Sequence, residues 1–249
     1  MVEELRKKEW KGPVDVEWLK VGEKTLADEF SGKQAQGGFG KIFIGKLKFK
    51  GKKPFPVAVK RFWEQMYPQS SRDYSRVINN LREAGVKMPK MAILRQGKER
   101  VLVSELFAKK RGTKIIQLAE LDPVLHQLSE KSRRNFTDFI ASVINAGYTP
   151  PWDSLGMLQT RQGIQPLIYD VDLFLNPPGH YVDFTANLLK KMFPDNAHRS
   201  MILDKMREKI LKPSSVAIFE EVRKVAGAPP TKFRMLKQRR AWEFGQEKE

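Results

Sequence analysis

The chain has 249 residues, of which 46 are Lys or Arg and 29 are Asp or Glu, giving a formal net charge of +17. This length suffices for one large domain or two packed lobes, and the hydrophobic fraction of 41% is that of an ordinary soluble protein. The absence of cysteine excludes disulfides, thiolate chemistry and cysteine-ligated metal sites, and the three histidines are too scattered to favour a histidine zinc site.

The charge and composition lead to further expectations. A positive excess of this size attracts nucleotides, nucleic acids or acidic protein surfaces, although a solvated basic surface has the same composition. No apolar stretch approaches the length of a membrane-spanning helix, and the charged N-terminus lacks the apolar segment of a secretory signal. We therefore expect a cytoplasmic protein. The lack of cysteine together with abundant Lys, Arg and Glu is also typical of a thermophile.

The first thirty residues are expected to be an extension that leads into the body of the protein. We interpret residues 1–30 as helical or irregular. Four apolar side chains in this segment are able to pack on the body: Trp10, Val16, Trp18 and Leu19.

Residues 31–63 are expected to form strands connected by two turns. Residues 35–42 read AQGGFGKI, which favours a strand, a glycine-rich turn and a second strand. Residues 57–60 read VAVK, a short apolar strand that ends in a lysine. Glycines let backbone N–H groups approach phosphate oxygens without a Cβ in the way, and a lysine supplies a point charge to them. The pair therefore predicts a polyphosphate site, with an ordinary hairpin turn as the alternative.

A helix and a hairpin are expected next. Residues 70–84 carry an apolar stripe at helical spacing, and Gly85 ends the pattern. The stripe consists of Tyr74, Val77, Ile78 and Leu81. Residues 91–94 and 101–106 are expected to pair as a hairpin.

From residue 115 onward the pattern is mostly helical. A proline-rich connector at 148–152 leads to Asp153, and residues 166–174 favour a strand that carries Asp170 and Asp172. Helices are expected near 118–128, 136–147, 183–193, 197–211 and 214–225.

The end of the chain is basic. Residues 232–240 contain five basic residues among nine, with Phe233 and Trp242 nearby. Such a segment suits phosphate contact combined with base stacking on nucleic acid. An acidic protein is another possible partner, and a charged terminal helix exposed to solvent is the plainer alternative.

The glycine-rich turn followed by Val-Ala-Val-Lys resembles the ATP-binding end of the protein-kinase-like superfamily. The short chain is similar to its trimmed branches, such as the Rio or lipopolysaccharide kinases. The resemblance covers residues 31–225 and implies an α+β, two-lobed protein-kinase-like fold. Its N-lobe, a small antiparallel β-sheet with one helix, would span 31–107, and a mostly helical C-lobe would span 108–225. An N-terminal extension at 1–30 and a basic tail at 226–249 would flank these lobes.

The resemblance also implies a nucleotide site with ATP as the ligand. Gly37, Gly38 and Gly40 would lie against the phosphates together with Lys60, while the first glycine of the family loop is replaced by Ala35. The strand at 101–107 resembles the kinase hinge, and Glu105 would lie beside the adenine. A sheet-edge strand with a solvent-facing acid is the alternative for Glu105.

Three acids resemble the catalytic and metal-binding residues of the family. Asp153 would orient the acceptor hydroxyl and take its proton, and Asp170, seventeen residues later, would hold Mg²⁺ against the phosphates. Asp172 would be a second metal ligand or a surface acid at the end of a strand. A helix cap is the alternative role for Asp153.

The sequence departs from the family pattern at several positions. Pro151 stands where the family has a histidine, and Leu158 stands where it has a metal-binding asparagine, with Gln159 beside it. Asp-Val-Asp replaces Asp-Phe-Gly at 170–172. The helix position that normally carries the glutamate partner of the lysine falls on Val77. Acids that could pair with Lys60 instead are Asp73, Glu64 and Glu83.

These features predict an atypical kinase-like protein that transfers the γ-phosphoryl group of Mg-ATP to an unknown acceptor hydroxyl. Two alternatives stay open because of the departures above. One is a pseudokinase that binds nucleotide without transfer, and the other is a basic scaffold associated with nucleic acid.

Overall fold

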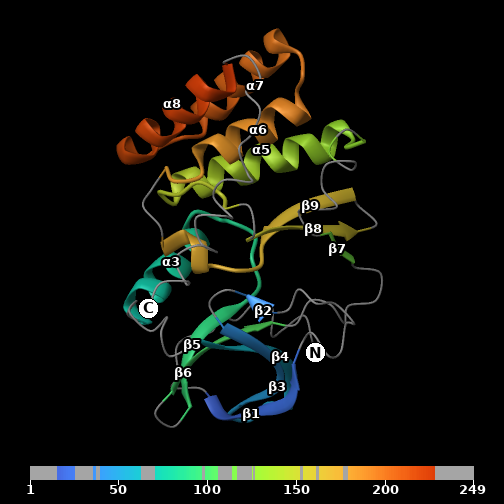
Figure 1. The fold of residues 1–249 in the computed structure, drawn as a ribbon, viewed down its shortest axis with the longest axis vertical. Helices are drawn as coiled ribbons and strands as arrows, with labels where there is room; N and C mark the ends of the chain where they lie inside the picture. Colours follow the sequence, from blue (N-terminus) through green and yellow to red (C-terminus); the bar gives the residue numbers. More distant parts are fainter. Residues whose placement is uncertain are drawn as a thin grey trace, which may run out of the picture.

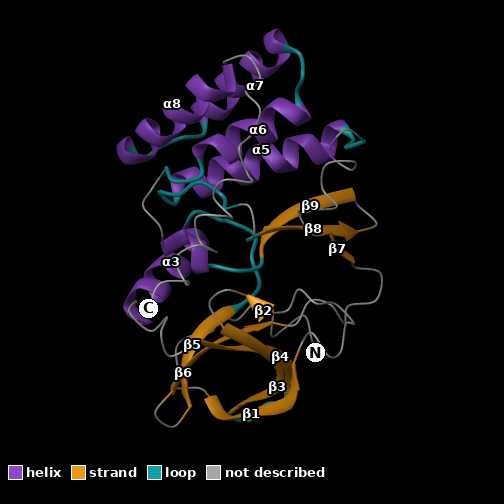
Figure 2. Cartoon of the chain, viewed as in Figure 1, coloured by secondary structure: helices purple, strands orange, loops and turns teal. Residues whose placement is uncertain are grey.

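A computed structural model describes most of the chain. The described residues are 16–25, 36–37, 40–62, 71–96, 99–105, 114–116, 125, 127–151, 154–160, 163–175 and 179–227. They form a mixed α/β structure with two antiparallel sheets and five α-helices (Figure 1, Figure 2). No described helix combines the length and the apolar character needed to cross a membrane.

The larger sheet has six strands, all paired antiparallel. Its order is β1-β3-β4-β6-β5, and β2 pairs with β3 outside this path. The strands are β1 (Val16–Thr25), β2 (Gln36–Gly37), β3 (Gly40–Phe49), β4 (Phe55–Phe62), β5 (Met91–Gln96) and β6 (Glu99–Glu105). The strands expected within 31–63 and the hairpin expected near 91–106 are confirmed.

Strand β1 corrects the expectation that residues 1–30 are helical or irregular. It pairs with β3, so that Leu19 lies opposite the fully buried Leu47. Leu19 packs on the sheet core while Lys20 is exposed, which is the alternation of a half-buried strand. Gly45 lets the two strands approach, because a Cβ there would lie 2.8 Å from the Lys20 carbonyl oxygen.

Helix α3 (Ser71–Glu83) confirms the helix expected at 70–84. Its apolar stripe is buried, and the helix packs against β5 and the later segment at 172–175. Gly85 ends it with φ of 72°, a left-handed conformation that favours glycine.

The second half of the described chain contains four helices and a small sheet. The helices are α5 (Glu130–Asn145), α6 (Val182–Met192), α7 (Asn196–Glu208) and α8 (Pro213–Gly227). They confirm four of the helices expected from periodicity. Residues 117–124 lie outside the described residues, and the helix expected at 118–128 is therefore untested over most of its length.

The small sheet is the feature that periodicity missed. It has the order β7-β8-β9, with β7 (Lys114–Ile116), β8 (Leu155–Thr160) and β9 (Gly163–Ile168). The strand expected at 166–174 is wrong in its second half, because β9 ends at Ile168 and a 3₁₀ helix, η5 (Asp172–Leu175), follows. Val171 and Phe174 are buried there, which turns the chain inward after the strand.

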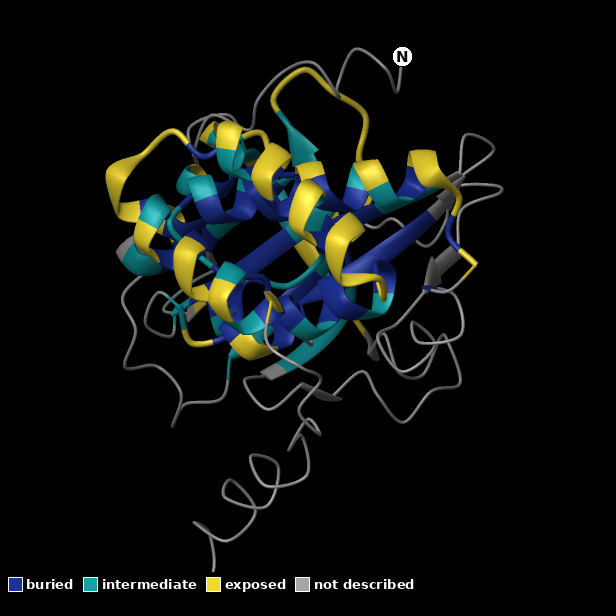
Figure 3. Ribbon diagram, turned by 90° about the horizontal axis from the view of Figure 1, so that it is seen from above, coloured by how far each residue is buried: buried dark blue, intermediate teal, exposed yellow. Residues whose placement is uncertain are grey.

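Two hydrophobic clusters organise the core. One lies on a single face of the six-stranded sheet and contains Leu47, Val57, Val59, Leu94, Val101 and Val103. The other extends from α3 and the opposite side of β5 and β6 through all four later helices. Seen from the helical end, exposed residues lie on the outward sides of the helices and buried residues lie between them (Figure 3). The candidate site lies beside this second cluster.

Candidate active site

Lys60 is the centre of the candidate site. Strand β4 directs Val57 and Val59 into the sheet cluster, and Lys60 therefore points to the opposite face. Its side chain is only 6% exposed. A lysine this deeply buried requires anionic partners, because an unpaired buried charge is costly.

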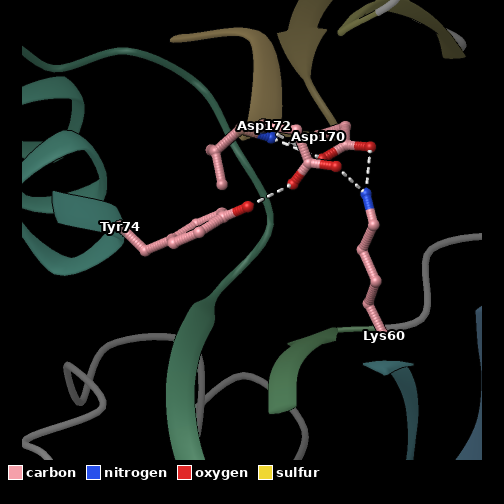
Figure 4. Close-up of polar contacts among 5 residues, drawn as sticks. Lys60, Tyr74, Asp170 and Asp172 are labelled. Carbon is pink, nitrogen blue, oxygen red and sulfur yellow. Dashed lines mark hydrogen bonds and ion pairs between the residues drawn. The ribbon is translucent and has the colours of Figure 1, made fainter. Parts of the chain in front are cut away.

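Those partners are Asp170 and Asp172. Lys60 Nζ lies 2.8 Å from Asp170 Oδ2 and also donates to Asp172 Oδ2. The Tyr74 hydroxyl donates to the other oxygen of Asp172, Oδ1, at 3.2 Å. Figure 4 shows Lys60 and Tyr74 converging on the two carboxylates from opposite sides.

The turn after β9 presents both carboxylates on one side. Asp170 Oδ1 accepts hydrogen bonds from the backbone N–H groups of Val171 and Asp172, at 2.7 and 3.3 Å. These bonds fold the chain back at the start of η5, and the intervening Val171 is fully buried. The Ile168 N–H also donates to the Lys87 carbonyl at 3.0 Å, which ties β9 to the segment after α3.

Tyr74 is a site residue that the sequence placed only in the apolar stripe of its helix. It is 6% exposed, and its ring lies 5.0 Å from that of Phe62 on β4. The sequence signal for this role was a tyrosine inside an apolar stripe, because the hydroxyl of a buried tyrosine requires a hydrogen-bond partner.

The acids considered as partners of Lys60 do not fill that role in the described structure. Asp73 on α3 pairs with Arg76 of the same helix at 2.9 Å, and Glu83 is exposed. Glu64 lies outside the described residues. Val77, at the position of the family glutamate, is buried in the core. The partners of Lys60 come instead from the turn after β9.

Burial and charge move the pKa values of this cluster in different directions. Burial alone would lower the pKa of Lys60, but Asp170 and Asp172 outweigh it and raise that pKa above its usual value. Burial opposes ionisation of Asp170, yet Lys60 and the backbone N–H donors hold its pKa below the usual range.

Asp172 behaves in the opposite way to Asp170. Burial, followed by the neighbouring charge of Asp170, raises the pKa of Asp172 to about 7. Burial and then Asp172 raise the pKa of Tyr74, so that the hydroxyl stays protonated and remains a donor. Two nearby carboxyl groups with separated pKa values are frequent at functional sites.

The glycine-rich turn lies at the same end of the sheet as Lys60. Gly37 pairs with Gly40 across the turn, Gly40 lies opposite Phe62, and Ile42 lies opposite Lys60. Gly38 is outside the described residues. The two predicted halves of the phosphate site, turn and lysine, are thus neighbours in the sheet.

Glu105 ends β6, where it lies opposite Val57 and donates its backbone N–H to the Lys90 carbonyl at 2.9 Å. The register also places Ile42, Ala58 and Leu102 on the sheet face that carries Lys60. This face offers apolar side chains beside the lysine.

Asp153 lies outside the described residues, and its predicted role is untested. Its described neighbour Ser154 accepts, through its carbonyl, a 3.0 Å hydrogen bond from the Tyr169 N–H. The backbone that follows Asp153 is thereby tied to the backbone that precedes Asp170.

The donor set fits a magnesium ion that is shared with phosphates. Among the described residues, no group of three or more His, Cys, Asp or Glu side chains could hold a metal alone. Mg²⁺ is commonly held by one or two carboxylates together with substrate phosphates and waters. Asp170 and Asp172 supply two carboxylates, and the Asp170 side chain is 26% exposed.

Comparisons with known proteins give only distant likenesses. No protein-family model matches the sequence, and no curated protein matches it. Among solved structures, the Helicobacter pylori proinflammatory kinase CtkA is 11% identical with a TM-score of 0.42, over 84% of this chain and 95% of that one. HipA of Shewanella oneidensis MR-1, solved with HipB and operator DNA, is 12% identical with a TM-score of 0.40, over 86% of this chain and 75% of that one.

Proposed function

We propose that this chain is a two-lobed, kinase-like phosphotransferase that binds Mg-ATP and transfers its γ-phosphoryl group to an acceptor hydroxyl. The observation that carries the proposal is the meeting of Lys60 with Asp170 and Asp172 beside a glycine-rich turn. Phosphoryl transfer depends on positioning and charge neutralisation, and this cluster supplies a cation and two hard oxygen ligands at one place.

Each residue has a role in this proposal. Gly37, Gly38 and Gly40 let the backbone approach the phosphates, and Lys60 contributes charge to their oxygens. Asp170 and Asp172 would hold Mg²⁺, which when bound neutralises charge that develops on the phosphates. Glu105 would lie in the segment beside the adenine.

Asp153 completes the proposal as the acceptor-orienting residue. In the transfer, the bond between the γ-phosphorus and the bridging oxygen breaks and a bond to the acceptor oxygen forms. The hydroxyl proton of the acceptor would pass to Asp153. A cytoplasmic location and a nucleic-acid or acidic-protein partner for the basic tail stay predictions.

Binding of a fluorescent ATP analogue, with and without Mg²⁺, tests the nucleotide site. Asp170→Asn is expected to remove the Mg²⁺-dependent part of the affinity, while Lys60→Met weakens binding by about tenfold or more under both conditions. Asp204→Asn is the matched control, because this exposed acid pairs with Arg223 on the surface. An Asp170→Asn protein with unchanged Mg²⁺-dependent affinity would contradict the metal-binding role.

Turnover separates the active enzyme from a pseudokinase. Two observations favour the pseudokinase as the second candidate: Lys60 occupies both carboxylates, and Pro151 and Leu158 replace family residues. An active enzyme predicts Mg²⁺-dependent release or transfer of labelled γ-phosphate that Asp153→Ala abolishes without loss of nucleotide binding. Tight nucleotide binding without any turnover by the unaltered protein would identify the second candidate.

A further inference from the structure

The face of the six-stranded sheet that carries Lys60 continues into a strongly basic surface. Directly paired residues of antiparallel strands lie on the same face. Lys60 pairs with Ile42, and four residues further along β3 Lys46 pairs with Lys20 of β1. At the rise of a strand, this places Lys46 about 13 Å along β3 from the level of Lys60.

Four side chains form this surface, which we call the basic face: Trp18, Lys20, Lys46 and Lys48. Lys20 and Lys46 are exposed, and Trp18 and Lys48 are half-buried. The turn between β3 and β4 adds three exposed lysines at its edge, Lys50, Lys52 and Lys53.

The charges of the basic face are poorly compensated by the described residues. Lys20 and Lys46 lie directly opposite each other across the β1–β3 ladder, and like charges in that position destabilise a sheet. An ion pair on this face joins Lys48 to Glu17 at 2.8 Å. No described acid forms an ion pair with Lys20 or Lys46. A bound polyanion would relieve their repulsion.

An aromatic ring lies within this cluster of lysines. Lys20 Nζ is 5.3 Å from the centre of the Trp18 ring. Trp18 is held on the basic face because the neighbouring Leu19 packs into the sheet core. Cations that contact a phosphate backbone, combined with an aromatic ring on which bases stack, are the features of single-strand binding surfaces.

We propose that the basic face binds single-stranded nucleic acid, with Lys20, Lys46 and Lys48 contacting phosphates and Trp18 stacking on a base. An acidic protein segment would use the lysines but would gain little from the tryptophan. The proposal does not depend on phosphotransfer, because none of these residues belongs to the candidate active site.

Binding of a labelled single-stranded RNA of about 16 nucleotides to the full chain, followed by fluorescence anisotropy between about 50 and 200 mM salt, tests the proposal. The double variant Lys20→Gln/Lys46→Gln is expected to weaken binding and to reduce the slope of log affinity against log salt by about 1.4, since each single-strand phosphate contact contributes about 0.7. Trp18→Leu is expected to lower affinity about 5- to 150-fold with little change in slope.

A second double variant, Lys205→Gln/Lys212→Gln, controls for net charge. Both lysines are exposed on the helical side of the protein, in α7 and just before α8. It should leave the slope unchanged, and unfolding midpoints of all variants should match the unaltered protein. The proposal is overturned if the two double variants have equal slopes, because binding then resides elsewhere, including in the basic tail. It is also overturned if Trp18→Leu has no effect and polyglutamate competes as well as RNA, which would identify an acidic-protein surface.

Discussion

Lys60, Asp170, Asp172 and Tyr74 form one interdependent cluster at the scale of single residues. The lysine is buried and lies between two carboxylates, one of which is itself buried. Removing one partner of such a group leaves the others buried without compensation, and that loss exceeds the net value of the pair.

Replacement of Lys60 by methionine is expected to destabilise the protein by about 3–5 kcal/mol. The Asp170 and Asp172 carboxylates would then repel each other without the lysine charge that compensates them. Urea unfolding measures the effect. Adding Asp172→Asn to Lys60→Met should recover part of the stability, since one buried charge is removed. Lys48→Met is the control at an exposed ion pair and should cost about 0–1 kcal/mol. Equal losses for the two lysines would argue against a buried charge cluster.

Replacement of Tyr74 by phenylalanine removes the donor to Asp172 Oδ1 while keeping the ring. We expect a stability loss of about 1–3 kcal/mol, because a buried carboxylate oxygen loses its partner. The Mg²⁺ concentration that half-saturates nucleotide binding should also rise, because Asp172 is less firmly oriented. Tyr148→Phe is the matched control, since that hydroxyl accepts a hydrogen bond from Asn80 Nδ2 at 3.3 Å and, within the described residues, bonds neither carboxylate. A stability loss with an unchanged Mg²⁺ requirement would limit Tyr74 to a structural role.

At the scale of elements, the close pairing of β1 with β3 is the feature that extends the sheet. Gly45 makes this pairing possible, since a Cβ there would lie 2.8 Å from the Lys20 carbonyl oxygen and 2.9 Å from Val59 Cγ2. The same pairing aligns Lys20 and Trp18 with the face that carries Lys60. Strand β1 therefore links the fold to the proposed nucleic-acid surface.

Gly45→Ala is expected to lower the free energy of unfolding by about 1–3 kcal/mol, because the added methyl group overpacks the β1–β3 interface. Gly227→Ala is the control, since a Cβ at that position meets nothing within 4 Å. Chemical denaturation of both variants gives the comparison. A Gly45→Ala protein as stable as the Gly227→Ala protein would contradict the close approach of the strands.

Alternation and helical spacing correctly predicted much at this scale, and their failures have a physical cause. The stripe of α3 and the hairpin of β5 and β6 are local patterns, and both were found. Strand β8 was missed because its residues 155–158 are all buried, so that no alternation between polar and apolar residues marks it. The 3₁₀ turn at Asp172 was missed because the burial of Val171 and Phe174 that turns the chain inward depends on the later helices.

At the scale of the whole molecule, one hydrophobic cluster joins the sheet to the helices. It contains Met91 and Leu102 from β5 and β6 together with Phe136 of α5 and Phe219 of α8. A shared core of this kind couples the unfolding of distant elements.

Thermal unfolding is therefore expected to be a single cooperative transition. Differential scanning calorimetry should give a calorimetric enthalpy equal to the van't Hoff enthalpy, because Met91 and Leu102 of the sheet share one hydrophobic cluster with residues of α3 and the later helices. Circular dichroism and tryptophan fluorescence should report the same midpoint. Two separate transitions would show that the sheet and the helices unfold as independent units.

The sequence by itself determined the local features of this protein. The glycine-rich turn, the Val-Ala-Val-Lys strand and the periodic helices depend on residues that are neighbours in the sequence. The local sequence pattern therefore predicts them. Only the tertiary structure decided which acids meet the lysine. Asp170 and Asp172 are 110 and 112 residues away from Lys60, and Tyr74 is 98 residues away from Asp172. Contacts over such separations depend on how the elements pack, because the buried cluster brings together the ammonium of β4, a tyrosine hydroxyl of α3 and two carboxylates of the turn after β9 at one point in space.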